Sequence, residues 1–287
     1  MTRFFSAQNV VVKYIASTEL RTKQKNLNLF LKAFLSGVMI AMGAVASSVA
    51  AHTAVDAGTT RLITGLIFPV GLIMTSVTGA ELFTGNCLLM MPALARKLRI
   101  MNLFRVMGIV YLGNFIGAVS IAVGTYLCGI LDYSDGLLGA FMIKITMAKA
   151  ELSFCQNIVS GILCNILVCV AVFMALCAWD IIGKTWAIYF PMMLFAIVGF
   201  EHCVANMYYF AMGLMVNNNP EYVHIAIERF GYSAERLEIL TIKNAIFGNL
   251  LPVTIGNLIG GMIFVGFPMY YLHKGAVHEM PPFEEET

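Results

Sequence analysis

Two short stretches decide the fold of this chain: Gly79-Ala80-Glu81-Leu82-Phe83-Thr84-Gly85-Asn86 and Gly199-Phe200-Glu201-His202-Cys203-Val204-Ala205-Asn206. Both contain the pattern Gly-x-Glu-x4-Asn, and each follows a Phe-Pro pair, at Phe68-Pro69 or Phe190-Pro191. Each stretch places small and polar residues inside a long apolar segment. The repetition indicates two related halves, each with an interrupted helix.

The composition of the chain excludes a water-soluble globule. Of its 287 residues, 59% are hydrophobic and only 12% are charged, whereas soluble domains contain about 45–50% apolar and about 25% charged residues. The formal net charge of +2 is too small to indicate a nucleic-acid partner. The sequence therefore predicts a membrane protein.

Six apolar segments are long enough to cross a bilayer, because a spanning helix needs about 20 mostly apolar residues. They lie at residues 29–55, 62–94, 103–130, 153–179, 186–216 and 245–272. An amphipathic helix over 1–28 precedes this domain of residues 29–272, and a tail over 273–287 follows it. With both termini on one side, twelve of the 18 Lys and Arg residues share that side. The positive-inside rule therefore predicts cytoplasmic termini in a multi-pass plasma-membrane protein.

Further matches extend the repeat over three segments in each half. Ser36-Gly37 in the first segment matches Ser160-Gly161 in the fourth. The pattern Gly-Asn-x-x-Gly begins at Gly113 in the third segment and at Gly256 in the sixth. Three matches in the same order indicate a true internal repeat.

The repeats lie at about residues 29–130 and 153–272, with three spans each. An odd number of spans inserts the second half upside down relative to the first, as in many transport proteins. Irregular backbone at membrane depth is tolerated only where it is buried in protein or lines a wet cavity. We therefore expect an all-α fold of six transmembrane helices, an inverted 3+3 repeat whose broken second and fifth helices meet near the midplane.

Each break contains a glutamate and an asparagine, Glu81 with Asn86 and Glu201 with Asn206. We interpret these four as structural residues. The carboxylates would accept hydrogen bonds from N–H groups freed by the break and hold it open, although direct contact of either glutamate with a solute stays an alternative.

The Gly-Asn-x-x-Gly motifs predict close packing, because glycines four residues apart let two helices approach. Asn114 and Asn257 would then be hydrogen-bonding links between helices. Contact of Asn257 with a solute is the alternative.

His202 lies in the interior of a predicted span, whereas His52 lies at the end of one and His224, His273 and His278 lie in a loop or the tail. An ionisable side chain in the bilayer is a functional candidate by default, and an imidazole donates hydrogen bonds and titrates near neutral pH. Thr84 offers a hydroxyl at similar depth, unless it bonds a backbone carbonyl. Asn165 would orient His202, line a pathway or bond a neighbouring helix. Lys149, at the start of the fourth segment, would either extend to the lipid interface or attract anions into a vestibule.

The chain carries no pattern of a catalytic, metal or cofactor site. Its seven cysteines form no C-x-x-C pair and lie mostly in apolar runs, where cysteine acts as a small hydrophobe. An enzymatic or haem-binding subunit would need a second intramembrane histidine or converging carboxylates. We therefore expect no enzymatic activity and no cofactor. A neutral-solute channel and a purely structural scaffold stay open as alternatives.

At these motifs the chain resembles the formate/nitrite transporter family. The resemblance is carried by Ala80-Glu81-Leu82-Phe83-Thr84, Phe200-Glu201-His202, Ala205-Asn206-Met207, Leu163-Cys164-Asn165 and Asn249-Leu250-x-Pro252-Val253-Thr254-x-Gly256-Asn257. It extends over roughly residues 8–272. The resemblance implies an aquaporin-like protomer with its own pore and a pentameric assembly.

The resemblance also implies roles for individual residues. Thr84, Lys149, Asn165 and His202 would be the polar residues of the pore. Two hydrophobic constrictions would be formed by Phe68, Leu72, Leu82, Phe83, Val168 and Phe195. We expect Phe83 and Phe195 at the constriction that removes water from the solute, and Phe68 and Leu72 at the inner one.

The function implied is passage of a small monovalent anion, formate first, with nitrite, hydrosulfide, lactate or acetate as alternatives. A bare charge at the centre of a bilayer costs at least about 2.5 kcal/mol. We therefore expect the anion to cross with a proton, with His202 supplying hydrogen bonds or the proton itself.

Overall fold

The computed structural model describes residues 4–278, which are helical apart from their loops and one isolated bridge between Phe4 and Ala178. Residues 1–3 and 279–287, parts of the predicted N-terminal helix and tail, lie outside the described part. Six stretches have the length and hydropathy of membrane spans: Asn26–Ala51, Ala57–Val77, Ile100–Leu127, Phe154–Cys177, Ile181–Val198 and Asn244–Val277. The prediction of an all-α fold with six spans is confirmed.

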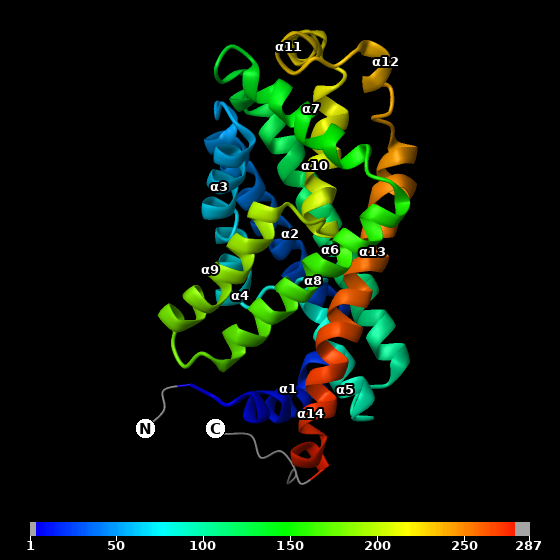
Figure 1. Ribbon diagram of the computed structural model, residues 1–287. Helices are drawn as coiled ribbons and strands as arrows, with labels where there is room; N and C mark the ends of the chain where they lie inside the picture. Colours follow the sequence, from blue (N-terminus) through cyan, green and yellow to red (C-terminus); the bar gives the residue numbers. More distant parts are fainter. Residues whose placement is uncertain (1–3, 279–287) are drawn as a thin grey trace.

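The elements of the first half follow the predicted order (Figure 1). They are α1 (Ala7–Thr22), α2 (Asn26–Ala51), α3 (Ala57–Ile67), α4 (Val70–Val77), the short 3-10 helix η1 (Gly85–Leu89), α5 (Met90–Leu94), α6 (Ile100–Leu127) and η2 (Ile130–Asp132). Helices α3 and α4 form the first part of the broken second span, and η1 with α5 continues it after the break.

The second half repeats this plan after an additional helix. Its elements are α7 (Leu137–Ala150), α8 (Phe154–Cys177), α9 (Ile181–Val198), α10 (Cys203–Val216), α11 (Pro220–Phe230), α12 (Ala234–Leu237), η3 (Asn244–Leu250), α13 (Leu251–Leu258), η4 (Ile259–Gly266) and α14 (Phe267–His278). Helices α11 and α12 lie at one end of the molecule, which we call the α11 end, whereas α1 and α14 lie at the opposite, α14 end (Figure 1).

Three α-helices outside the spans were not predicted: α7, α11 and the short α12. Helix α7 has 14 residues, fewer than a span requires, and its apolar side chains are buried on most sides. It packs against α10 and α11. Because α7 has no one-sided apolar stripe and no spanning length, its sequence reads as part of a loop until the tertiary contacts are known.

Both helix breaks occur at a glycine with a left-handed backbone. Gly79 has φ +70° and Gly199 has φ +77°, at equivalent positions of the two repeats. Glycine adopts this conformation without the steric cost that a Cβ imposes. The two glycines therefore end α4 and α9 and release the segments that carry Glu81 and Glu201.

Asn114 and Asn257 bind the two breaks with the same set of hydrogen bonds. The Asn114 Oδ1 atom accepts from the Phe83 N–H at 2.8 Å, and its Nδ2 atom donates to Glu81 O at 3.0 Å and to Ala33 O at 2.7 Å. Asn257 repeats the two contacts with the break in the second half, and both asparagine side chains are fully buried. Each asparagine therefore ties a break to a neighbouring helix through backbone atoms.

In the second repeat, Asn257 Oδ1 accepts from the Cys203 N–H at 2.9 Å, and Nδ2 donates to Glu201 O at 3.0 Å and to Gly161 O at 2.8 Å. The acceptor Gly161 packs against the sixth span, where an added Cβ would lie 2.8 Å from Val253 O. The inverted repeat thus extends to individual hydrogen bonds.

Candidate functional site

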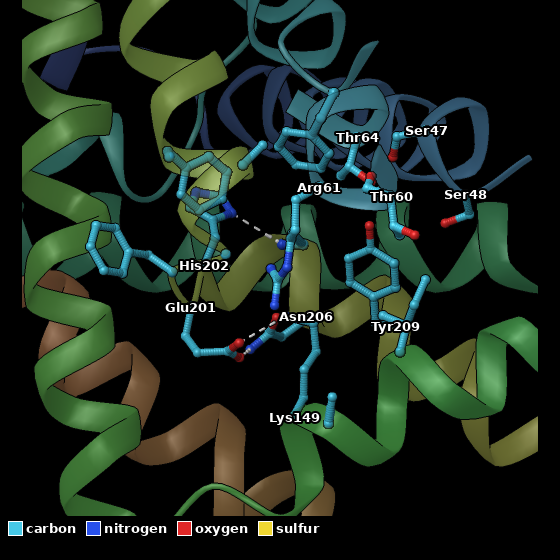
Figure 2. Close-up of a pocket in the computed structure, with 18 of the residues that line it drawn as sticks. Ser47, Ser48, Thr60, Arg61, Thr64, Lys149, Glu201, His202, Asn206 and Tyr209 are labelled. Carbon is cyan, nitrogen blue, oxygen red and sulfur yellow. Dashed lines mark hydrogen bonds and ion pairs between the residues drawn. The ribbon is translucent and has the colours of Figure 1, made fainter. Parts of the chain in front are cut away.

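A cavity of 340 Å³ lies beside the second break. Its walls come from α2, α3, α7, α9 and α10, and Lys144 is one of the residues that line it. Arg61, Lys149 and Glu201 also line the cavity (Figure 2). Phe68, Phe195 and His202 also line it. One water requires only about 10–15 Å³ of such space, so the cavity has room for several waters and a small solute.

His202 joins this cavity to the first repeat. Its side chain is only 1% exposed and caps α10, with Nδ1 accepting from the Ala205 N–H at 3.1 Å. Its Nε2 lies 2.8 Å from Thr84 Oγ1, in the other break. Because Nδ1 is an acceptor, the neutral ring carries its proton on Nε2 and donates it to Thr84. The two predicted polar residues are therefore in direct contact.

Glu201 lies beside His202 and is saturated with donors. Lys149 Nζ lies 2.9 Å from Oε1, and Asn206 Nδ2 and Asn249 Nδ2 donate to Oε2 at 2.6 Å and 3.3 Å. The Glu201 side chain is 3% exposed and that of Lys149 is 15% exposed. The carboxylate is thus held by neighbouring side chains, whereas the prediction gave this role to backbone N–H groups freed by the break.

Lys149 lies in a different helix from the one predicted, and its side chain takes the direction of one of the two alternatives given for it. It belongs to the last turn of α7, so its placement at the start of the fourth span is wrong. Its ammonium group lies against Glu201 and 5.2 Å from the centre of the Tyr209 ring. The side chain therefore faces the cavity (Figure 2), not the lipid interface.

Asn249 is a part of the site that residue-level reasoning missed. It accepts from Asn206 Nδ2 at 2.7 Å, and it donates to Lys149 O at 3.2 Å and to Asn157 Oδ1 at 3.0 Å. The sequence signal that could have identified Asn249 is its place at the start of the sixth-span motif that ends at Asn257. Asn249 connects the sixth span to the Lys149–Glu201 pair.

The first break lacks the equivalent amide contact. Asn86 is 3% exposed, and its Nδ2 atom has no hydrogen-bond partner among residues 4–278. Leu82 occupies the position equivalent to His202 and is 5% exposed. The symmetry of the backbone therefore supports a chemically asymmetric site.

Asn165 contacts the backbone around Thr84. Its Nδ2 atom lies 2.6 Å from Asn257 O, 3.3 Å from Thr84 O and 3.2 Å from Cys87 Sγ. Of the three alternatives for Asn165, the structure shows bonding to neighbouring segments. Asn165 thus positions Thr84, and Thr84 contacts His202.

The predicted constriction residues group differently from expectation. The rings of Phe68 and Phe195 lie 5.6 Å apart between centroids, and Phe195 lies 6.0 Å from His202. Phe83 instead packs on Tyr111 at 4.9 Å. Phe195 thus packs against Phe68, which was predicted for the other constriction, because α3 and α4 both lie against α9. The placing of Phe83 and Phe195 at one constriction stays a prediction.

The three other predicted constriction residues are buried. Leu72 is 1% exposed, Leu82 is 5% exposed and Val168 is 0% exposed. Cavity residues absent from the sequence-based prediction include Arg61, Lys144 and Tyr209. Arg61 and Lys144 are charged, but the sequence places Arg61 at the end of a predicted span and Lys144 in a predicted loop. Neither place indicates a residue of the site.

An inverted repeat with broken helices, a cationic cavity and a buried histidine at its edge defines a membrane transport protein. Comparison with known proteins identifies its family. The family model "Formate/nitrite transporter" matches residues 8–271. The chain belongs to the formate/nitrite transporter family, whose members are channels and transporters.

Individual relatives agree with this assignment. A "Probable formate transporter" of Methanothermobacter thermautotrophicus is 33% identical over 276 residues, covering 90% of this chain and 93% of the relative. "Formate channel FocA" of Haemophilus influenzae is 32% identical over 249 residues, which cover 85% of this chain and 86% of the relative. A solved "Pentameric formate channel with formate bound" is 31% identical, with a TM-score of 0.76 over 87% of this chain and 98% of that chain.

Proposed function

We propose that this chain passes formate and similar small monovalent anions through the plasma membrane, as a pentamer whose protomers each contain a pathway. The formate specificity is supported by the relatives described as formate transporters and channels, and the pentamer by the similar, solved pentameric formate channel. Cytoplasmic termini are supported by the charge distribution of the loops. In this orientation the α11 end faces outward.

The observation that carries the proposal is the His202–Thr84 contact at the edge of a cationic cavity. The three cations of the cavity outnumber its one carboxylate, Glu201. Such a cleft raises the local concentration of anions. Phe68 and Phe195 then present aromatic surface next to His202, where an entering anion loses part of its water.

Proton linkage follows from the cost of charge in the bilayer. A formate ion would cross the apolar section at high cost, whereas formic acid is neutral. Nδ1 of His202 is occupied by the Ala205 N–H, so the neutral ring acts through Nε2–H. We infer that Nε2–H and the Thr84 hydroxyl hold the anion while it takes up a proton from water in the cavity. His202 is then the point where anion and proton meet.

Reconstituted vesicles test this function. Vesicles containing the wild-type protein should take up formate and exclude sucrose, and uptake should increase when the outside is acidified. His202→Phe should remove this pH-dependent uptake while the protein still assembles as the same oligomer. Absence of flux of any small anion through the wild type would refute the proposal, and an unchanged pH dependence in His202→Phe would refute the role of His202.

A further inference from the structure

Arg61 lies in the cavity and has a free guanidinium group. It is exposed, lies near the start of α3 and points toward the break that contains Gly199 (Figure 2). A Cβ added to Gly199 would overlap the guanidinium, the nearest atoms being Nη1 and Cζ of Arg61. Among residues 4–278, Arg61 has no hydrogen bond or ion pair. The guanidinium thus lies against the backbone of the break, and its donors have no partner among residues 4–278.

The charges around Arg61 do not supply a partner for it. Glu201 is the carboxylate among the residues that line the cavity, and Lys149, Asn206 and Asn249 already occupy both of its oxygens. The second unpaired cation, Lys144, lies 4.7 Å from the centre of the Phe230 ring. The cavity therefore has an excess of positive charge that its own described residues leave unpaired.

Nearby hydroxyl groups are also committed to other partners. Thr60 Oγ1 donates to Asp56 O at 2.8 Å, and Thr64 Oγ1 donates to Thr60 O at 2.8 Å. Since both donate within their own helix, the N–H groups of Arg61 are the remaining donors on this wall of the cavity. An anion entering along α3 would meet them first.

The chemistry of the two kinds of cation differs. A guanidinium is a planar fork that binds both oxygens of a carboxylate in parallel, whereas an ammonium attracts any anion as a point charge. The charge of Lys149 is partly compensated by its ion pair with Glu201. Discrimination by anion shape therefore falls to Arg61.

We propose that Arg61, which lies against Gly199, is a capture site that favours anions with a pair of oxygens, monocarboxylates above all, over anions without such a pair, such as hydrosulfide and chloride. The site precedes the Phe68–Phe195 pair on the way to His202. The proposal rests on the proposed function and adds the class of anion that the pathway captures.

Two substitutions of Arg61 separate the effect of the planar guanidinium group from the effect of its positive charge. In reconstituted vesicles, Arg61→Lys keeps the charge and should raise the KM for formate about five-fold, because an exposed bidentate pair contributes about 1 kcal/mol. The KM for hydrosulfide should stay within a factor of about two, as expected for a retained point charge. Arg61→Gln should raise both KM values. Arg99→Lys and Arg99→Gln, at an exposed arginine beyond the cavity, are the matched controls and should change neither.

A binding measurement makes the test independent of transport. Phenylglyoxal modifies accessible arginines, and mass spectrometry of the wild-type protein reports the extent at each one. Formate or acetate should protect Arg61, chloride at the same concentration should not, and Arg96 and Arg99 should be modified equally in all cases. Absence of formate flux with Arg61 protected would refute the proposed function alone. Equal KM shifts for both anions in Arg61→Lys, no shift, or no protection by carboxylates would overturn the capture site.

Discussion

Removal of the Lys149 charge should lower the free energy of unfolding, because it leaves the buried Glu201 carboxylate without its counterion. Lys149→Met keeps the length of the side chain and leaves the Glu201 carboxylate, 3% exposed, with only the amides of Asn206 and Asn249. Two charges about 4 Å apart interact by about 4 kcal/mol at an effective dielectric constant of about 20. Because Lys149 is 15% exposed and two amide donors stay, we expect a loss of about 2 kcal/mol in the free energy of unfolding.

The assay is thermal unfolding of the purified protein together with formate uptake. A loss of about 2 kcal/mol corresponds to a melting temperature lower by about 4–8 °C. Uptake should also fall, because an unpaired carboxylate in the cavity repels anions. The double variant Lys149→Met with Glu201→Gln removes the orphaned charge, so it should be more stable than Lys149→Met and recover part of the uptake.

The matched control is an exposed ion pair at the α11 end. Arg236 Nε lies 2.5 Å from Glu151 Oε1, with the two side chains 52% and 32% exposed. Arg236→Gln should cost less than about 1 kcal/mol, as exposed pairs do, and leave uptake unchanged. If Lys149→Met is as stable as the wild type, or if the double variant is no more stable than Lys149→Met, the assignment of Lys149 as the counterion of Glu201 is refuted.

Three further predictions concern the helix breaks and the start of α3. Asn257→Ala removes the acceptor of the buried Cys203 N–H and should lower the free energy of unfolding by about 1–3 kcal/mol in denaturant titrations; a wild-type midpoint would contradict the role of the asparagine link. Gly199→Ala should cost about 1–3 kcal/mol, because φ is +77°, and should weaken formate capture by displacing the guanidinium that lies there; unchanged stability and KM would count against both effects. The pKa of Asp56 lies below its ordinary value of 3.8, because the N–H and hydroxyl of Thr59 donate to its carboxylate. The stabilisation that Asp56 gives to α3 is therefore complete above about pH 3.8 and is lost as the pH falls further. Asp56→Asn should remove this part of the pH dependence of unfolding, and identical pH profiles would exclude it.

Local sequence was sufficient to predict the breaks and their supports. Gly79 and Gly199 are needed for a left-handed backbone, and the repeated asparagines Asn114 and Asn257 have the same contacts in both halves. These features depend on residue type and on order along the chain. Both can be recognised from one sequence because the repeat supplies an internal comparison.

Features that depend on packing between distant segments could not be predicted in this way. The contact of Phe68 with Phe195 depends on how α4 and α9 lie together, which hydropathy does not determine. Arg61 reads as a charged residue at the end of a span, and its orientation toward Gly199 is visible only in the folded chain. Helix α7 is too short to be recognised as a span, although it carries Lys149 into the cavity.

The central claim, that an anion and a proton meet at His202 and cross together, is tested most directly by counting protons. Vesicles that contain the protein and a trapped pH-sensitive dye are exposed to a formate gradient, and uptake and internal acidification are recorded together. One proton entering with each formate, with both signals lost in His202→Phe, is the predicted result. Formate uptake without acidification would contradict the account.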